Sequence, residues 1–308
     1  MSKVVVTGGA GFLGSHLATG LLDAGYEVVV IDNLATGRIS NLDHIKDRIQ
    51  FLQMDINDTA ALTKACEGAE FVFHAAAIPA VPRSIDDPVG TNHANIDGTL
   101  SVLMAAKVTG VKRVVYSSSS SVYGDSPVLP KREDMATAPI SPYGTQKLAA
   151  EQYVMHFNTF FNLETVALRY FNVFGPRQDP NSPYSAVIPL FITLMKAGKS
   201  PLVHGNGSTT RDFTYVENVV KANILAATVP DARGHIFNIA CNEQQSLNAL
   251  IATIGTALGT NVQPEYGPFR AGDIKDSLAD ISKAKQILGY EPAVSFEEGI
   301  KRTIASLS

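Results

Sequence analysis

Short runs of hydrophobic residues recur along the first half of the chain, separated by longer stretches in which apolar and polar residues mix. The runs are apolar throughout rather than alternating with polar positions, which is typical of parallel strands buried on both faces of a sheet. The pattern predicts strands at Lys3–Thr7, Glu27–Asp32, Ile49–Asp55, Glu70–His74, Lys112–Ser117 and Asn162–Arg169.

Helical spacing fills the stretches between these runs. Leu13, Leu17 and Leu21 follow one another at intervals of four residues, and Gly25 is placed to end that helix. The predicted helices of this half are Phe12–Ala24, Thr59–Cys66, Thr91–Thr109 and Tyr143–Phe160. This alternation of strands and helices predicts an α/β fold with a Rossmann-type, doubly wound parallel sheet.

The pattern of hydrophobic and polar residues changes after about Gly175. Prolines interrupt the segment that follows, and helical patterns become more frequent. They predict helices at Ala186–Ala197, Val216–Thr228, Leu247–Leu258 and Phe296–Leu307. We therefore expect a Rossmann domain over residues 1–175 and a smaller, mostly helical lobe over residues 176–308, with a strand near Ile236–Ala240 that returns to the first domain.

Composition and charge exclude several classes of partner. The 308 residues include 25 Lys and Arg against 29 Asp and Glu, a formal net charge of −4. This balance provides neither the basic surface that nucleic acids require nor a polybasic stretch for anionic lipids. No apolar run approaches the roughly 18 residues that span a bilayer, and the N-terminus does not resemble a signal peptide. We expect a cytoplasmic protein with two reduced thiols, Cys66 and Cys241, and no metal site built from its histidines.

A glycine-rich segment, Thr7–Gly14, joins the first predicted strand to the first predicted helix. Gly8 allows a tight turn, Gly11 lets the backbone approach a pyrophosphate, and Gly14 lets helix and strand pack closely, while the helix N-terminus offers N–H groups to the anion. Asp32 ends the second predicted strand, where a carboxylate accepts hydrogen bonds from adenosine ribose hydroxyls and repels a 2′-phosphate. The segment predicts a site for NAD rather than NADP.

Tyr143 and Lys147 are four residues apart in a predicted helix, so their side chains lie on one face. A tyrosine with a pKa of about 10 is barely ionised at neutral pH. A neighbouring ammonium and a bound nicotinamide cation favour the phenolate, which is a usable base. The run Ser117–Ser121 lies where open α/β sheets bind ligands, at the end of a strand. We expect Ser119 to hydrogen-bond the reacting hydroxyl, with Ser120 as the alternative.

Together, the segments TGGAGFLG, SSSSSVYG and YGTQK resemble the extended short-chain dehydrogenase/reductase family, and the resemblance covers essentially the whole chain. The segments Arg169–Pro180, Arg211–Phe213 and Arg270–Asp273 are similar to those of the nucleotide-sugar 4-epimerases. The stretch from Arg169 to Pro189 looks most like the branch that acts on both UDP-N-acetylglucosamine and UDP-glucose. The resemblance implies reversible C4 epimerisation of UDP-hexoses through a transient 4-keto sugar and a tightly bound NAD.

The resemblance also implies a role for individual residues. Tyr143 would take the proton of the 4-hydroxyl, and Ser119 and Lys147 would complete the catalytic set. The residues implied to contact NAD are Gly8, Gly11, Phe12, Leu13, Asp32, Asn33, Asp55, Ile56, Ala75, Ala77, Asn95, Tyr143, Lys147 and Tyr170. Those implied to contact the UDP-sugar are Ser120, Asn172, Val187, Val203, Arg211, Arg270, Asp273 and Ser277, with the two arginines on the pyrophosphate.

Two features narrow the reaction and the sugar. In the slots before Val-Tyr-Gly, the 4,6-dehydratases of the family carry an Asp-Glu pair and the decarboxylases a Glu, whereas this chain has Ser120 and Ser121. Hydroxyls cannot act as carboxylate bases, so net dehydration or decarboxylation lacks its acid/base group. Epimerases restricted to unacetylated hexoses carry a bulky Tyr at the position of Ser277, where a serine leaves room for a 2-N-acetyl group.

Two alternative functions stay open at this point. One is an NAD(P)-dependent nucleotide-sugar oxidoreductase that reduces a 4-keto sugar on the same scaffold. The other is a non-catalytic NAD-sensing protein, which the presence of Ser119, Tyr143 and Lys147 disfavours. The resemblance also implies a homodimer built from two helices of each subunit. Thr91–Thr109 and Tyr143–Phe160 are the candidates, although their apolar content fits packing on the sheet equally well.

Overall fold

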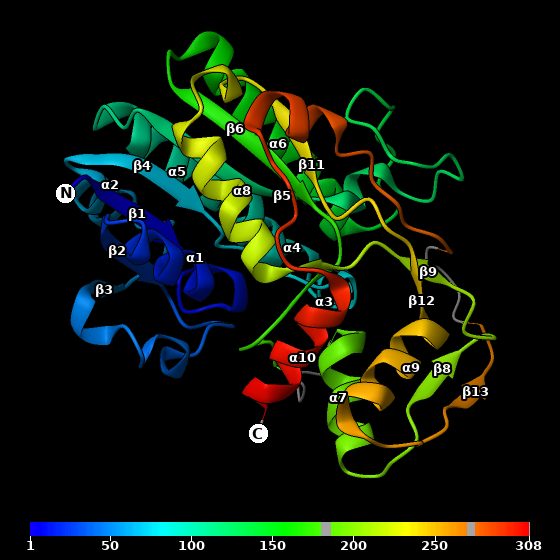
Figure 1. Cartoon of the computed structure of the whole chain (residues 1–308). Helices are drawn as coiled ribbons and strands as arrows, with labels where there is room; N and C mark the ends of the chain where they lie inside the picture. Colours follow the sequence, from blue (N-terminus) through cyan, green and yellow to red (C-terminus); the bar gives the residue numbers. More distant parts are fainter. Residues whose placement is uncertain (180–185, 270–274, 308) are drawn as a thin grey trace.

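A seven-stranded parallel sheet forms the centre of the protein, which is described by a computed structural model over residues 1–179, 186–269 and 275–307 (Figure 1). Its strand order is β11-β6-β5-β4-β1-β2-β3. The strands are β1 (Lys3–Thr7), β2 (Glu27–Asp32), β3 (Ile49–Gln53), β4 (Ala69–His74), β5 (Arg113–Ser119), β6 (Glu164–Tyr170) and β11 (Ile236–Ile239). The order reverses between β1 and β4, so the predicted Rossmann-type α/β fold is confirmed.

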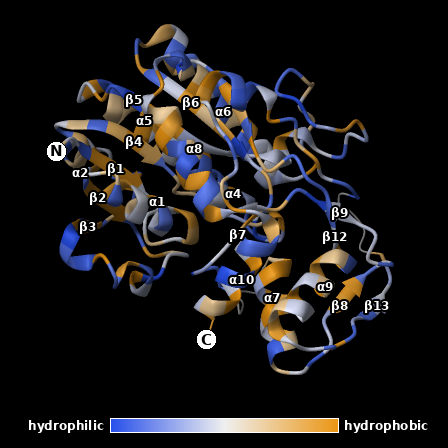
Figure 2. Cartoon of the chain, in the orientation of Figure 1, coloured by the Kyte–Doolittle hydropathy of each residue, from blue (hydrophilic) through white to orange (hydrophobic). Residues whose placement is uncertain are grey.

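Helices cover both faces of this sheet and enclose two apolar cores. One face carries α1 (Phe12–Asp23) and α8 (Val216–Thr228), and the other carries α2 (Thr59–Cys66), α5 (Gly98–Val108) and α6 (Pro142–Phe160). Along β1, Val4 and Val6 belong to the first core and Val5 to the second. Burial on both faces explains the uninterrupted hydrophobic strands that are visible at the centre of Figure 2.

The connections between the strands of the sheet contain several short elements. They are η1 (Ile39–Leu42), η2 (Lys46–Arg48), α3 (Val81–Asp86), α4 (Pro88–Asn92), the π turn η3 (His93–Asp97) and η4 (Ser120–Tyr123). The helix predicted at Thr91–Thr109 therefore begins earlier, at Pro88, and passes through one π turn before α5. The strand predicted from Asn162 begins only at Glu164, because Asn162 has a left-handed φ of 54° that a strand does not accommodate.

A third apolar core belongs to the C-terminal lobe. It is enclosed by α7 (Val187–Lys196), α9 (Leu247–Leu258) and α10 (Phe296–Ser306), which lie together beside the sheet in Figure 1. The remaining elements are β7 (Val173–Phe174), β8 (Leu202–His204), β9 (Thr210–Arg211), β10 (Thr214–Tyr215), η5 (Pro230–Ala232), β12 (Gln245–Ser246), β13 (Glu265–Gly267) and the π turn η6 (Ala284–Leu288). Strands this short leave no hydrophobic period in the sequence, and none of them was predicted.

Two elements that follow residue 175 pack on the sheet. Strand β11 pairs in parallel with β6, and α8 packs on the same face as α1. The division of the chain into domains at residue 175 stays a prediction.

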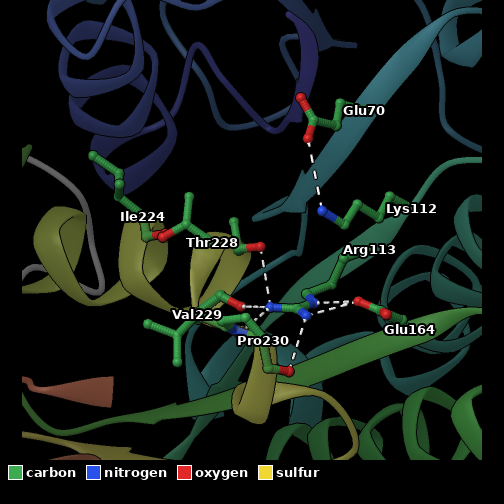
Figure 3. Close-up of polar contacts among 10 residues, drawn as sticks. Glu70, Lys112, Arg113, Glu164, Ile224, Thr228, Val229 and Pro230 are labelled. Atoms are coloured by element: carbon green, nitrogen blue, oxygen red, sulfur yellow. Dashed lines mark hydrogen bonds and ion pairs between the residues drawn. The ribbon is translucent and has the colours of Figure 1, made fainter.

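A buried arginine, paired with a half-buried glutamate, holds the amino-terminal edge of the sheet to the end of α8 (Figure 3). Arg113, the first residue of β5, donates through Nε (2.9 Å) and Nη2 (2.7 Å) to Oε2 of Glu164, the first residue of β6. Its Nη1 donates to the carbonyls of Ala226, Ala227 and Val229 at 2.8, 3.0 and 2.7 Å. Arg113 therefore satisfies carbonyl groups that the end of a helix leaves open.

Candidate active site

The glycine segment forms a turn that no larger residue could occupy. Gly8 has a left-handed φ of 68°, and a Cβ there would lie 2.6 Å from the backbone N and Cα of Ala76. A Cβ on Gly14 would lie 2.1 Å from the carbonyl oxygen of Gly8. Helix α1 begins directly after Gly11, which offers its first turn no side-chain cap. A cradle of bare backbone before a helix N-terminus fits a pyrophosphate group.

Asp32 is buried at the carboxyl end of β2 and contacts this cradle. Its Oδ2 accepts a hydrogen bond from Ala10 N at 2.9 Å and its Oδ1 one from Leu34 N at 2.8 Å. Burial raises the pKa of this carboxyl. A carboxylate can accept about four hydrogen bonds, so Asp32 retains capacity for ribose hydroxyls.

Further residues predicted to contact the cofactor follow the ends of β3 and β4. Asn33 donates to Asp55 Oδ2 at 2.7 Å, and both side chains are exposed. Ala75 and Ala77 follow β4 and are half-buried, whereas Ile56 lies within the second apolar core. These positions place the predicted adenosine contacts along one edge of the sheet.

Asn95 connects the loop after β4 to α6 through hydrogen bonds. Its Oδ1 accepts from Ile78 N at 2.7 Å, and its Nδ2 donates to Gln146 Oε1 at 2.8 Å. Asn95 is 1% exposed, so it fixes the loop after β4 from within.

The three predicted catalytic residues converge at the carboxyl end of β5. Ser119 is the last residue of β5, and its side chain lies close enough to Tyr143 to lower the pKa of that phenol. Its Oγ accepts hydrogen bonds from Ser121 N at 3.2 Å and Ser121 Oγ at 2.9 Å. Lys147 lies one turn further along α6 and donates through Nζ to the carbonyl of Ser117 at 2.8 Å. Ser120 is half-buried and begins η4, so β5 continues two residues beyond the predicted end of the strand.

The electrostatics of this cluster are set mainly by burial. Burial raises the pKa of Tyr143 to about 12, and the hydrogen bond with Ser119 opposes the rise. Burial lowers the pKa of Lys147 to about 8, so its ammonium persists at neutral pH. The groups of the protein alone therefore leave Tyr143 as a phenol, and the ionisation expected from the sequence needs a further positive charge beside it.

Three of the predicted sugar-side residues, Asn172, Arg211 and Ser277, lie where β7, β9 and the segment around Ser277 meet. Asn172, at a φ of 35°, donates through Nδ2 to Asp212 O at 3.3 Å and Ser277 Oγ at 3.4 Å. Arg211 donates through Nη1 to the carbonyls of Thr210 and Lys275 at 2.8 and 3.2 Å. Arg270 and Asp273, predicted on the pyrophosphate and the uridine ribose, lie outside the described residues.

Five residues that were predicted to contact NAD or the UDP-sugar lie in the apolar cores or pack against them. Tyr170 is buried, and its hydroxyl lies 3.3 Å from Ser117 Oγ and accepts from Asn223 Nδ2 at 2.9 Å. Phe12, Leu13 and Val187 are half-buried against the third core, and Val203 is 0% exposed inside it. The side chain of Val203 therefore shapes the lobe from within.

Two buried polar residues near the site make hydrogen bonds that the sequence does not reveal. His74 ends β4 and bridges Thr7 Oγ1 (2.7 Å) and Thr99 Oγ1 (3.0 Å); burial lowers its pKa to about 3. Asp212 accepts from Cys241 N (2.9 Å) and Ala279 N (3.1 Å), and burial raises its pKa to about 6. Both stand in segments that the sequence analysis singled out, but only the fold reveals their partners.

None of the described helices is long and apolar enough to cross a membrane. Within the same part of the chain, no group of three or more His, Cys, Asp or Glu residues could hold a metal ion.

Comparison with known proteins agrees with this geometry. The model of the NAD dependent epimerase/dehydratase family matches residues 4–240. The UDP-glucose 4-epimerase of Mycolicibacterium smegmatis is 38% identical over 306 residues, which cover 98% of this chain and 97% of the relative.

Solved structures match over nearly the whole length. The UDP-N-acetylglucosamine 4-epimerase from Methanobrevibacter ruminantium M1, in complex with UDP-N-acetylmuramic acid, is 41% identical with a TM-score of 0.95, covering 99% of this chain and 98% of that one. The UDP-glucose 4-epimerase of Thermotoga maritima with UDP-glucose is 37% identical with a TM-score of 0.93 and the same coverage. The resemblance seen in the sequence is confirmed, and the chain belongs to the NAD-dependent epimerase/dehydratase family.

Proposed function

We propose that this protein catalyses the reversible C4 epimerisation of UDP-hexoses, both UDP-N-acetylglucosamine/UDP-N-acetylgalactosamine and UDP-glucose/UDP-galactose, with a tightly bound NAD. The observation that carries the proposal is the convergence of Ser119, Tyr143 and Lys147 at the carboxyl end of β5, close to the glycine cradle and Asp32. The substrates named for the similar proteins, UDP-glucose and UDP-N-acetylglucosamine, support the choice of sugar nucleotide.

The cradle around Gly8 and Gly11 would hold the pyrophosphate of NAD, and Asp32 its adenosine ribose. NAD, when bound, would supply the acceptor and donor for the hydride of C4, and its nicotinamide cation would supply the further positive charge that favours the phenolate of Tyr143. Tyr143 removes the proton of the 4-hydroxyl and later gives it back. Ser119 orients that hydroxyl, and its proximity to Tyr143, whose pKa it lowers, favours it over Ser120. Lys147, anchored on the carbonyl of Ser117, holds a positive charge near the site.

The role of Tyr143 is tested by replacing it with phenylalanine. Tyr143→Phe removes only the hydroxyl, so turnover should fall by about 10²-fold or more while NAD stays bound. Tyr153→Phe, on the exposed side of the same helix, is the matched control and should keep normal activity. Near-normal turnover of Tyr143→Phe would remove the proposed base, and loss of NAD from this variant would show that its inactivity has another cause.

Ser277 is proposed to set the width of the sugar pocket. Its Oγ lies 3.4 Å from Asn172 Nδ2, beside the residues assigned to the sugar nucleotide. Ser277→Tyr should suppress turnover of UDP-N-acetylglucosamine and spare UDP-glucose, whereas Ser208→Tyr, on an exposed loop of the same lobe, should affect neither. Equal loss on both substrates would exclude a gate at Ser277.

The protein is also proposed to act as a cytoplasmic homodimer. Met104 and Val108 on α5 and Phe160 on α6 are 42%, 64% and 71% exposed, and the two helices pack against each other. Exposed apolar side chains on adjoining helices suit a four-helix interface. Light scattering should give twice the chain mass for the wild type and the single mass for Val108→Asp combined with Phe160→Asp. A monomeric wild type would exclude this interface.

A further inference from the structure

A completely buried ion pair lies directly behind the catalytic cluster. Glu151 on α6 and Arg169 on β6 are 0% and 2% exposed. Arg169 donates to Glu151 through Nη2 at 2.6 Å and Nε at 3.0 Å, which is the strong, fork-shaped arrangement of a guanidinium on a carboxylate. Ser118 Oγ donates to the same carboxylate at 2.6 Å.

Each member of this group is joined to a catalytic residue by rigid secondary structure. Tyr143, Lys147 and Glu151 follow at intervals of four along α6 and so share one helix face. Ser118 lies between Ser117, whose carbonyl accepts from Lys147, and Ser119, which lies beside Tyr143 and lowers its pKa. The carboxylate of Glu151 therefore connects the helix that carries the proposed base to the strand that carries the serine.

The sheet register completes the connection. Arg169 pairs with Ser118 across the β5–β6 ladder, so both point from neighbouring strands to the face that α6 covers. A shift of α6 along the sheet would break the bonds to both strands at once.

A contribution to stability alone does not account for the burial of this ion pair. Removing two charges from water costs several kcal/mol per ion, and well-packed apolar replacements of buried pairs are often neutral or stabilising. The buried arginine at the other edge of the sheet, Arg113, has a different role because it also binds three carbonyls at the end of α8. Glu151 and Arg169 bind each other and the strand of the catalytic serine instead.

We propose that Glu151 and Arg169, through Ser118, are positioning residues that set the distance between Ser119 on β5 and Tyr143 and Lys147 on α6. This inference rests on the catalytic roles given above under the proposed function. Because the pair is buried, it acts through α6, which it fixes on the sheet where helix and strand must meet correctly for proton transfer.

The test compares four variants of the full-length protein with the wild type. Glu151→Gln keeps the shape and removes the charge, Arg169→Lys keeps the charge and removes the fork, and Glu151→Leu with Arg169→Met replaces the pair by apolar groups. Glu164→Gln changes the half-buried carboxylate that pairs with buried Arg113 at the far edge of the sheet, and it is the control. For each, kcat and KM for UDP-glucose, bound NAD and the thermal midpoint are measured.

Glu151→Gln should lower kcat by about 10- to 100-fold, the size that small misplacements of catalytic groups produce, with KM within about twofold and NAD retained. Arg169→Lys should lose less, since one hydrogen bond and the charge remain. The apolar double variant should keep a thermal midpoint near that of the wild type and still lose kcat. Glu164→Gln should keep a normal kcat whatever its thermal midpoint.

Full kcat in the apolar double variant would overturn the positioning role. The positioning role would also be overturned if the loss of kcat paralleled the loss in thermal midpoint across all four variants, including the control Glu164→Gln. The wild type in the same assay tests the proposed function separately: turnover of the wild type with fully active variants overturns only the positioning role, whereas a silent wild type overturns both.

Discussion

Replacing Gly8 by alanine tests whether the turn before α1 requires a bare backbone. The residue has a φ of 68°, which costs a side chain about 1–2 kcal/mol. The new Cβ would also lie 2.6 Å from Ala76 N, so the loop after β4 would have to move by about 0.8 Å to reach the ordinary contact distance of 3.4 Å. Overpacking of this kind costs about 1–3 kcal/mol. The sum predicts that Gly8→Ala lowers the free energy of unfolding by about 2–5 kcal/mol.

Gly25→Ala is the matched control, because Gly25 has a similar φ of 87° but nothing within 4 Å of the added Cβ. Gly25→Ala should lower the free energy of unfolding only by the cost of a side chain at a left-handed φ, about 1–2 kcal/mol. Urea unfolding of both variants gives the two free energies, and the NAD released from each purified protein reports on the cradle. Gly8→Ala should also lose most of its NAD. Equal destabilisation of the two variants, with NAD retained by both, would refute the close approach of the loop to the turn.

Three further outcomes follow from buried groups. The pKa of His74, about 3 in the folded protein against 6.5 ordinarily, means that this residue takes up a proton only on unfolding. Stability should therefore fall as the pH drops below about 6.5, and His74→Gln should make the slope of unfolding free energy shallower by up to about 1.4 kcal/mol per pH unit; identical slopes in urea titrations at pH 7, 6 and 5 would contradict this. Burial raises the pKa of Cys66 to about 11 and that of the half-buried Cys241 to about 12, so a thiol reagent at pH 8 should label both slowly until denaturant is added, and rapid labelling of the native protein would contradict these raised pKa values. NAD should bind more tightly than NADP by calorimetry, with the difference reduced in Asp32→Ser; equal affinities in the wild type would exclude the assigned role of Asp32.

The main sheet was largely predictable because its strands are buried on both faces. The strands β1 and β2 have the bounds expected from their apolar runs alone. The strand β5 continues through Ser118 and Ser119, which no hydrophobic pattern indicates, because hydrogen bonds satisfy their hydroxyls. Likewise, the left-handed turn at Asn162 shortens β6 for a reason that is local to the backbone.

The site was predictable where motifs are contiguous and unpredictable where the fold brings distant residues together. Tyr143 and Lys147 are linked by helical spacing, so their common face could be derived from the sequence. Glu151 and Arg169 are 18 positions apart on different elements, and charged residues are almost never fully buried without a partner. Only the sheet register and the packing of α6 place this pair behind the catalytic residues.

The most direct test of the proposed function is proton NMR of the purified protein with UDP-N-acetylglucosamine and, separately, with UDP-glucose, without added cofactor. The proposal predicts that the C4 epimer appears in both samples, because the resident NAD is regenerated in every turnover. Conversion of UDP-glucose alone would keep the epimerase and exclude the open pocket at Ser277. Silence in both samples, persisting after NAD is added, would contradict the proposed epimerisation.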